Sequence, residues 1–277
     1  MAIGIAGMTV VIGSILSVLV VVVVSLVAAA AGSGELISDP LELDAVMNRL
    51  QRSAFGSAVL IVPQQLVFLA VALLLAWPLG RQWRSRYRLQ KPRGRPWQWV
   101  AASFAPMALG MLASSLLEWL NGGPLELPQV FGEWFLQQQG WNVVAFLLLI
   151  SLVPAVCEEM FFRGFLLGSL ERRFSPWLAI GITGVVFGLA HLHPVHVVLV
   201  IPLGIWTALV ARAFDSVYVA MSAHLVNNAT SVLLVLGADD PESLADPVTA
   251  GTFAVSLAAL AVSLPSALRG GRGRCEV

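Results

Sequence analysis

Charged residues are scarce in this chain. Lysine, arginine, aspartate and glutamate make up 12% of its 277 residues, whereas hydrophobic residues make up 58%. That balance excludes an ordinary soluble globular protein, and several apolar runs are long enough to cross a lipid bilayer. We therefore predict an integral membrane protein, in which an ionisable residue inside an apolar run marks a functional or tightly paired position.

Cysteine is almost absent as well. The two cysteines, Cys157 inside an apolar run and Cys275 near the end of the chain, exclude a disulfide framework and a cysteine-rich metal site. The sequence also lacks the HExxH zinc motif. We expect Cys157 to pack in the core rather than to act as a nucleophile.

The apolar runs predict the fold. A run of about 20 residues can cross the bilayer as one helix, so we predict an all-α, polytopic membrane protein with about eight transmembrane helices. The runs are Met8–Ala31, Phe55–Leu79, Trp97–Leu120, Trp141–Leu170, Pro176–Leu192, Val195–Ala213, Val217–Leu236 and Val248–Leu268. Residues 1–140 would hold the first helices and a basic cytoplasmic loop, residues 141–236 a core of helices that carry buried polar residues, and residues 237–277 the last helix and a basic tail, all in one membrane domain.

Arginine positions predict the orientation. Short loops rich in lysine and arginine stay in the cytoplasm, and residues 81–95 form such a loop between two apolar runs. If that loop is inside, only Arg49 and Arg52 fall outside. We predict a multi-pass protein of the cell membrane with both termini cytoplasmic, and we interpret the basic loop as a topology signal rather than a nucleic-acid site.

Two adjacent glutamates interrupt the fourth apolar run. Glu158 and Glu159 diverge by about 100° around an α-helix, so they face different directions. Arg163 follows Glu159 by four residues, which is the favourable order for an ion pair along one helix face. Glu158 lacks such a partner, so it must find one on another helix or hold a proton. A carboxylate in that position can act as a base.

Other polar residues reach a similar depth on neighbouring helices. From the turn between the fourth and fifth runs, Glu158 lies about 24 Å back along one helix and His191 about 26 Å forward along the next. From the turn that precedes the seventh run, His224 and Asn228 lie about 12 Å and about 18 Å along that helix. We therefore predict that these side chains, from spans four, five and seven, meet inside the bilayer.

Their chemistry suits the hydrolysis of an amide bond. A base must take a proton from water while hydrogen-bond donors stabilise the oxyanion that forms at the attacked carbonyl. Glu158 with His191 would activate the water, and His224 with Asn228 would stabilise the oxyanion. No serine or cysteine stands in an obvious nucleophile context.

The same positions carry three motifs of a known family. Residues 158–163 match EExxxR, residues 187–191 match FxxxH, and residues 224–228 match a histidine followed four residues later by asparagine. In this order the motifs resemble the CAAX-protease and bacteriocin-processing family, the intramembrane glutamic endopeptidases that are also called type II CAAX prenyl proteases or Abi-type proteins.

The resemblance implies a metal-independent glutamic endopeptidase that cuts a membrane-associated or prenylated protein or peptide. It implies that the residues matching Glu158 and His191 activate water and that those matching His224 and Asn228 form the oxyanion site. It adds that the residues matching Glu159 and Arg163 support Glu158. The implied partners are the peptide or prenylated substrate and the lipid bilayer, without nucleic acid. The oligomeric state stays open.

Three alternatives stay open beside this hypothesis. The protein could be a non-catalytic bacteriocin-immunity or scaffold protein that keeps the motifs. It could be a proton-coupled transporter, which predicts inverted repeats with interrupted helices, and we find none in the sequence. Glu158, His191 and His224 could bind zinc if they converged on one point, but we favour a site without a metal.

Two smaller features have less clear roles. Pro63, Gln64 and Gln65 interrupt the second apolar run, and we favour a helix kink there over the wall of a polar cavity. His193 and His196 flank Pro194 near the end of a run, and we expect them to be interfacial or hydrogen-bonded rather than ligands.

Overall fold

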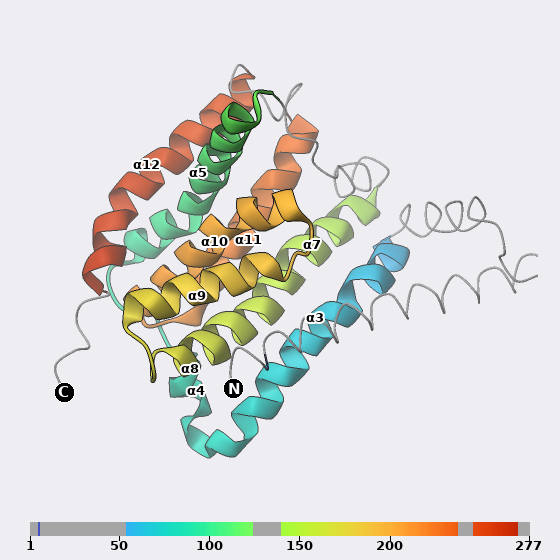
Figure 1. The fold of residues 1–277 in the computed structure, drawn as a ribbon. Helices are drawn as coiled ribbons and strands as arrows, with labels where there is room; N and C mark the ends of the chain where they lie inside the picture. The colour runs from blue at the N-terminus through green and yellow to red at the C-terminus, as the bar shows by residue number, and fades with distance from the viewer. Residues whose placement is uncertain (1–4, 6–53, 124–139, 238–245, 271–277) are drawn as a thin grey trace, which may run out of the picture.

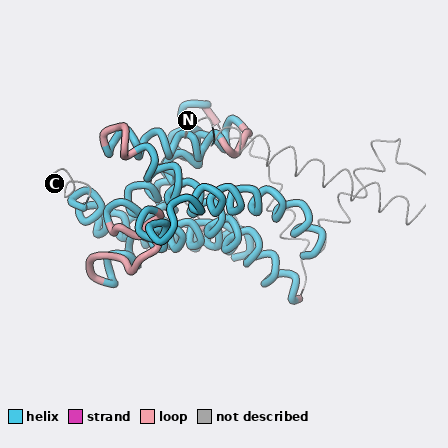
Figure 2. Tube along the Cα trace, turned by 90° about the horizontal axis from the view of Figure 1, so that it is seen from below, coloured by secondary structure: helices cyan, strands magenta, loops and turns pink. Residues whose placement is uncertain are grey.

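The described part of the molecule is helical. In this computed structural model the described residues are 5, 54–123, 140–237 and 246–270, and their regular structure contains helices and no strands (Figures 1 and 2). The all-α prediction is therefore confirmed. The predicted first run, Met8–Ala31, lies outside the described residues, and so do the two ends of the chain.

The helices follow the apolar runs of the sequence. In chain order they are α3 (Ala54–Ala76), the 3₁₀ helix η1 (Trp77–Gln82), α4 (Trp83–Arg86), α5 (Pro96–Asn121), α7 (Trp141–Glu159), the π-helix η2 (Met160–Leu167), α8 (Gly168–Leu170), α9 (Pro176–Leu189), α10 (Pro194–Ala213), α11 (Val217–Gly237) and α12 (Pro247–Gly270).

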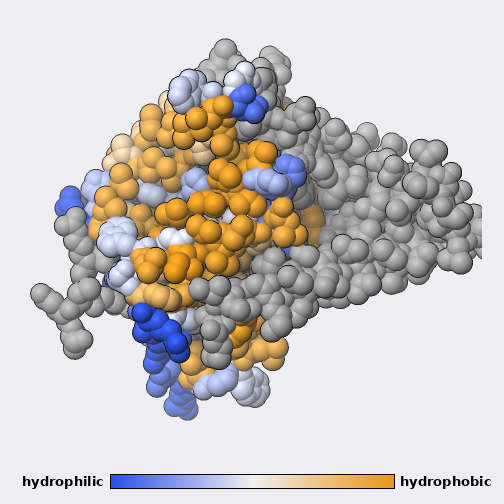
Figure 3. Space-filling view, viewed as in Figure 1, coloured by the Kyte–Doolittle hydropathy of each residue, from blue (hydrophilic) through white to orange (hydrophobic). Residues whose placement is uncertain are grey.

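Six helical segments in the described ranges are long and apolar enough to cross a membrane. They are Ile61–Arg86, Pro96–Asn121, Trp141–Leu170, Pro194–Ala213, Val217–Val235 and Pro247–Arg269. Large apolar side chains stay exposed along them, and hydrophobic residues cover the middle of the face in Figure 3, as lipid contact requires. The chain is a multi-pass membrane protein.

The fifth predicted span is shorter than expected. We predicted Pro176–Leu192, but α9 ends at Leu189 and has 14 residues, too few for a full crossing. Leu192 has a φ of 62°, and His193 has an extended conformation before Pro194. A residue before proline is disfavoured in the helical region, so the chain turns here and starts α10. His191 thus lies in a turn rather than on a helix.

Helix α7 lies between α3 and α11. It packs against α3 on one flank and against α11 on the other, while α5 packs along α12 and α9 along α10 (Figure 1). The α9–α10 contact is made at the level of the backbone, because a Cβ atom on Gly204 would lie 2.8 Å from the carbonyl oxygen of Gly184. This close approach brings the backbone of α10 towards η2.

The helix that carries the two glutamates changes its winding directly after them. Residues Met160–Leu167 form a π-helix, whereas the sequence predicted a continuous α-helix. Gly164 in this segment faces the ring of Tyr87, where a Cβ atom would lie 2.5 Å from Cδ1. The hydroxyl of Tyr87 donates a hydrogen bond of 2.7 Å to the Ala72 carbonyl. π-turns inside α-helices occur frequently at functional sites.

An ion cluster, the loop network, joins the loops at one end of the bundle, and three of its members, Arg88, Arg212 and Asp215, are buried. Its members are Arg88, Arg93, Glu171, Arg212 and Asp215. Arg88 and Arg212 both pair with Glu171, and the Arg212 contact measures 2.8 Å. Asp215 pairs with Arg93 at 3.0 Å and with Nε of Arg88 at 3.5 Å. Two arginines that we interpreted only as topology signals therefore also hold three loops together.

Candidate active site

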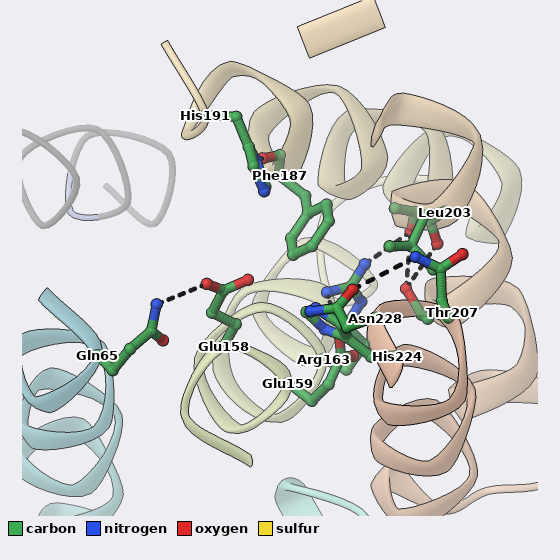
Figure 4. A network of polar contacts seen from close by, with 12 residues as sticks. Gln65, Glu158, Glu159, Arg163, Phe187, His191, Leu203, Thr207, His224 and Asn228 are labelled. Carbon is green, nitrogen blue, oxygen red and sulfur yellow. Dashed lines mark hydrogen bonds and ion pairs between the residues drawn. The ribbon is translucent and has the colours of Figure 1, made fainter. Parts of the chain in front are cut away.

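The Glu158 carboxylate has a neutral partner on another helix. Gln65 of α3 donates a hydrogen bond of 2.9 Å from Nε2 to Oε1 of Glu158. Both side chains are buried, with 8% of Glu158 and 5% of Gln65 exposed. In Figure 4 the Glu158 carboxylate points away from Glu159, as the helical phase predicted. The preferred interpretation of Gln65 as part of a kink was wrong, because its side chain belongs to the polar site.

Glu159 lies in a closed ionic contact, the Glu159 network, which consists of Glu159, Arg163 and His224. Arg163 donates from Nη1 to Oε1 of Glu159 at 2.8 Å, so the predicted pair is confirmed. Nδ1 of His224 lies 2.9 Å from the same oxygen. Glu159 and Arg163 are fully buried, and 3% of His224 is exposed. The two adjacent glutamates thus differ in partner and in charge balance.

Arg163 is also fixed from its other side. Its Nη2 donates a hydrogen bond of 2.9 Å to the carbonyl of Gly204 in α10, which the close α9–α10 contact makes possible. Its guanidinium lies 4.4 Å from the ring centroid of Phe187, a cation–π contact. The Phe187 ring makes edge contacts with His191 and His224, at centroid distances of 5.3 Å and 5.6 Å. Phe187 therefore packs against both histidines of the predicted site.

His191 is held in one tautomer by its backbone contact. Its Nδ1 lies 3.1 Å from the Phe187 carbonyl oxygen, which can only accept a hydrogen bond. Nδ1 therefore carries the proton in the neutral ring, and the lone pair lies on Nε2. His191 can accept a proton through Nε2.

Asn228 makes two contacts on α11 and α7. Its Nδ2 donates a hydrogen bond of 3.0 Å to the Ile150 carbonyl, and its Oδ1 accepts one of 3.3 Å from Nδ2 of Asn227. An amide nitrogen carries two hydrogens, so Nδ2 keeps one for a further acceptor.

One cavity, the polar chamber, brings the four predicted residues together. It has a volume of about 590 Å³, and Glu158, His191, His224 and Asn228 all line it. Gln65 lines it as well, whereas Glu159 and Arg163 lie behind its wall. The volume is in the range of sites that take small organic ligands.

Within the described residues, no group of three or more histidine, cysteine, aspartate or glutamate side chains is arranged to hold a metal ion. One nitrogen of His224 and one oxygen of Glu159 are engaged with each other. Cys157 is buried, with 5% of its surface exposed, and does not line the polar chamber.

Residues 140–230, about a third of the chain, match the family described as Type II CAAX prenyl endopeptidase Rce1-like. This segment is Rce1-like. The match covers α7, η2, α9, α10 and most of α11, and it includes all three motifs, so the resemblance seen in the sequence is confirmed for the segment that holds the site. The Rce1-like family is a peptidase family. No curated protein and no solved structure matches the chain.

Proposed function

We propose that this protein is an intramembrane glutamic endopeptidase that hydrolyses a peptide bond of a membrane-associated or prenylated protein or peptide without a metal ion. The contrast between two adjacent carboxylates carries the proposal. Glu159 is paired with Arg163 and contacts His224, whereas Glu158 faces the polar chamber and accepts its hydrogen bond from the neutral amide of Gln65. The Rce1-like match of this segment supports the peptidase class.

The first step is activation of water. Glu158, with Nε2 of His191, takes a proton from a water molecule in the polar chamber, and the resulting hydroxide attacks the carbonyl carbon of the substrate. The hydrogen bond from Gln65 orients the carboxylate without neutralising it. When the tetrahedral intermediate collapses, the C–N bond breaks and the leaving amine takes the proton from Glu158 or His191.

His224 and Asn228 stabilise the oxyanion. Nδ1 of His224 donates a hydrogen bond to the Glu159 carboxylate and therefore carries a proton. The ring can also donate from Nε2 only when that nitrogen is protonated as well, that is, as an imidazolium. Glu159 balances that charge, and Arg163 in turn fixes Glu159. The free hydrogen on Nδ2 of Asn228 supplies the other donor.

We propose the same orientation as from the sequence. The protein lies in the cell membrane with both termini in the cytoplasm. The loop network supports it, because loops predicted to be cytoplasmic lie together at one end of the bundle. We propose residues 141–236 as the catalytic core, with Gln65 contributed from outside it.

Cleavage of a prenylated CAAX reporter peptide by the purified protein in detergent tests the proposal. Wild type is compared with Glu158→Gln, with and without a strong chelator. We expect wild type to cleave the peptide regardless of chelator and Glu158→Gln to be inactive. Loss of wild-type activity on chelation would contradict the metal-free mechanism, and unchanged activity of Glu158→Gln would contradict the role of this glutamate.

A further inference from the structure

The polar chamber contains a third histidine that the proposed mechanism does not use. His196, in the first turn of α10, lines this chamber together with His191 and His224. Its ring lies against that of His191, with the two centroids 5.0 Å apart and the ring planes inclined at 45°. From the sequence we expected an interfacial or hydrogen-bonded His196, and the structure places its ring in the wall of the proposed active site.

The ring nitrogens distinguish His196 from the other two histidines of the chamber. Nδ1 of His191 is engaged by the Phe187 carbonyl, and Nδ1 of His224 by the Glu159 carboxylate. Neither ring nitrogen of His196 makes a hydrogen bond to a described residue. An imidazole with both nitrogens free can take up a proton at one nitrogen and release a proton from the other. His196 can therefore relay a proton, whereas His191 has only Nε2 for uptake and release.

Hydrolysis of an amide needs a proton at a second atom. Nε2 of His191 receives its proton from the attacking water, but the C–N bond breaks only when the leaving nitrogen is protonated. The hydrogen bond to the Phe187 carbonyl holds the His191 ring, so this ring cannot turn to carry the proton to a new acceptor. The His196 ring, in contact with it, can accept the proton directly or through one water molecule.

We propose that His196 is the general acid that protonates the leaving amine. The inference deepens the proposed function and rests on it, because it takes Glu158 and His191 as the groups that activate water. Nε2–H of the His191 imidazolium gives its proton to one nitrogen of His196. The other nitrogen of His196 gives its proton to the amine nitrogen, which keeps the electron pair of the broken C–N bond. Both rings end neutral, and the proton taken from water has reached the amine.

The leaving group distinguishes this role from packing. Two substrates share a peptide that ends at the prenylated cysteine and carry at its carbonyl either a p-nitroanilide or a p-nitrophenyl ester. The aniline must be protonated to leave, whereas p-nitrophenolate leaves as an anion. Loss of a general acid therefore slows cleavage of the anilide and spares cleavage of the ester.

His196→Gln and His196→Phe test the proposal together. Glutamine keeps a polar side chain, and phenylalanine keeps a ring against His191, but neither takes up a proton. We expect each variant to lose about 100-fold in kcat on the anilide, and less than about threefold on the ester. His193→Gln is the matched control, because His193 directly precedes α10 and does not line the polar chamber. It should cleave both substrates within about threefold of wild type.

Steady-state rates decide between the outcomes, with Glu158→Gln as the blank for spontaneous hydrolysis of the ester. The ratio of the anilide rate to the ester rate does not depend on the amount of folded protein, so a variant that folds poorly still gives an answer. A fall of that ratio in both His196 variants, with no fall in His193→Gln, supports the proposal. An equal loss on the two substrates would overturn it, and so would a wild-type rate on the anilide. Wild type that cleaves neither substrate would contradict the proposed function and remove the inference with it.

Discussion

The Glu159 network and the loop network are both ion clusters with buried members, yet their charge balance differs. In the loop network, three arginines surround two carboxylates, and each carboxylate has two arginine partners. Near the Glu159 network there are two glutamates and one arginine, and that arginine pairs with Glu159. Glu158 is left to face the polar chamber beside a neutral amide.

The loop network therefore stabilises the fold, whereas the Glu159 network stabilises the fold and leaves the neighbouring Glu158 carboxylate available for chemistry. Breaking a buried ion pair by removing one partner leaves an uncompensated charge and is strongly destabilising. Substitution of a carboxylate that pairs with an arginine in either network should therefore lower the stability of the protein. Substitution of Glu158, which accepts a hydrogen bond from Gln65, should instead lower catalysis.

Arg163→Leu should have the largest effect. It removes the only arginine of the Glu159 network and leaves the fully buried Glu159 carboxylate in contact with His224 alone among the members of that network. We expect the protein to lose about 3–5 kcal/mol of stability, measured by thermal unfolding in detergent. Arg86→Leu, at an exposed position of α4, should change stability by less than about 0.5 kcal/mol. Equal effects of the two changes would contradict the comparison.

Asn228→Ala should reduce turnover of the reporter peptide by about 100-fold, because loss of one oxyanion donor typically costs that much. The neighbouring Asn227→Ala removes only the hydrogen bond that Asn228 accepts, so we expect a loss of less than about tenfold. Steady-state kinetics on both variants would check this order. A larger loss for Asn227→Ala than for Asn228→Ala would contradict the assignment of the oxyanion donor to Asn228.

Glu171→Gln should affect stability and spare catalysis. The change removes the charge that Arg88 and Arg212 share, and we expect a loss of about 2 kcal/mol, less than for a fully buried pair because Glu171 keeps some solvent contact. Turnover per folded molecule should stay at the wild-type level, since Glu171 does not line the polar chamber. Activity lost without a change in unfolding temperature would refute the division between the two networks.

Gln65→Leu should give the smallest effect. Its hydrogen bond to Glu158 spans 93 residues, and its loss should reduce kcat by about tenfold through poorer orientation of the carboxylate. Gln64→Leu is the matched control, because Gln64 lines the same chamber. Initial rates at saturating peptide give kcat for both variants. A reduced kcat in Gln64→Leu but not in Gln65→Leu would contradict the role given to Gln65.

Local spacing predicted what lies within one helix. The order of Glu159 and Arg163 predicted their ion pair, and the helical phase predicted that Glu158 faces elsewhere. Positions along neighbouring helices predicted that His191 and His224 share a cavity with Glu158, and they do. These predictions depend on few residues and on regular geometry.

Contacts between distant segments could not be predicted in the same way. The partner of Glu158 comes from α3, and the carbonyl that fixes Arg163 comes from α10. Neither pairing has a periodic signal in the sequence. The π-helix after Glu159 and the early end of α9 depend on packing and on a local turn, which apolar runs do not reveal.

The most direct test compares Glu158→Gln with Glu159→Gln in the same assays, turnover of the reporter peptide and unfolding temperature in detergent. We predict that Glu158→Gln loses at least about 100-fold in turnover while its unfolding temperature stays within about 2 °C of wild type. Glu159→Gln should lower the unfolding temperature by about 6 °C or more, because it leaves Arg163 buried without its counter-ion. Wild-type turnover in Glu158→Gln, or wild-type stability in Glu159→Gln, would contradict the account.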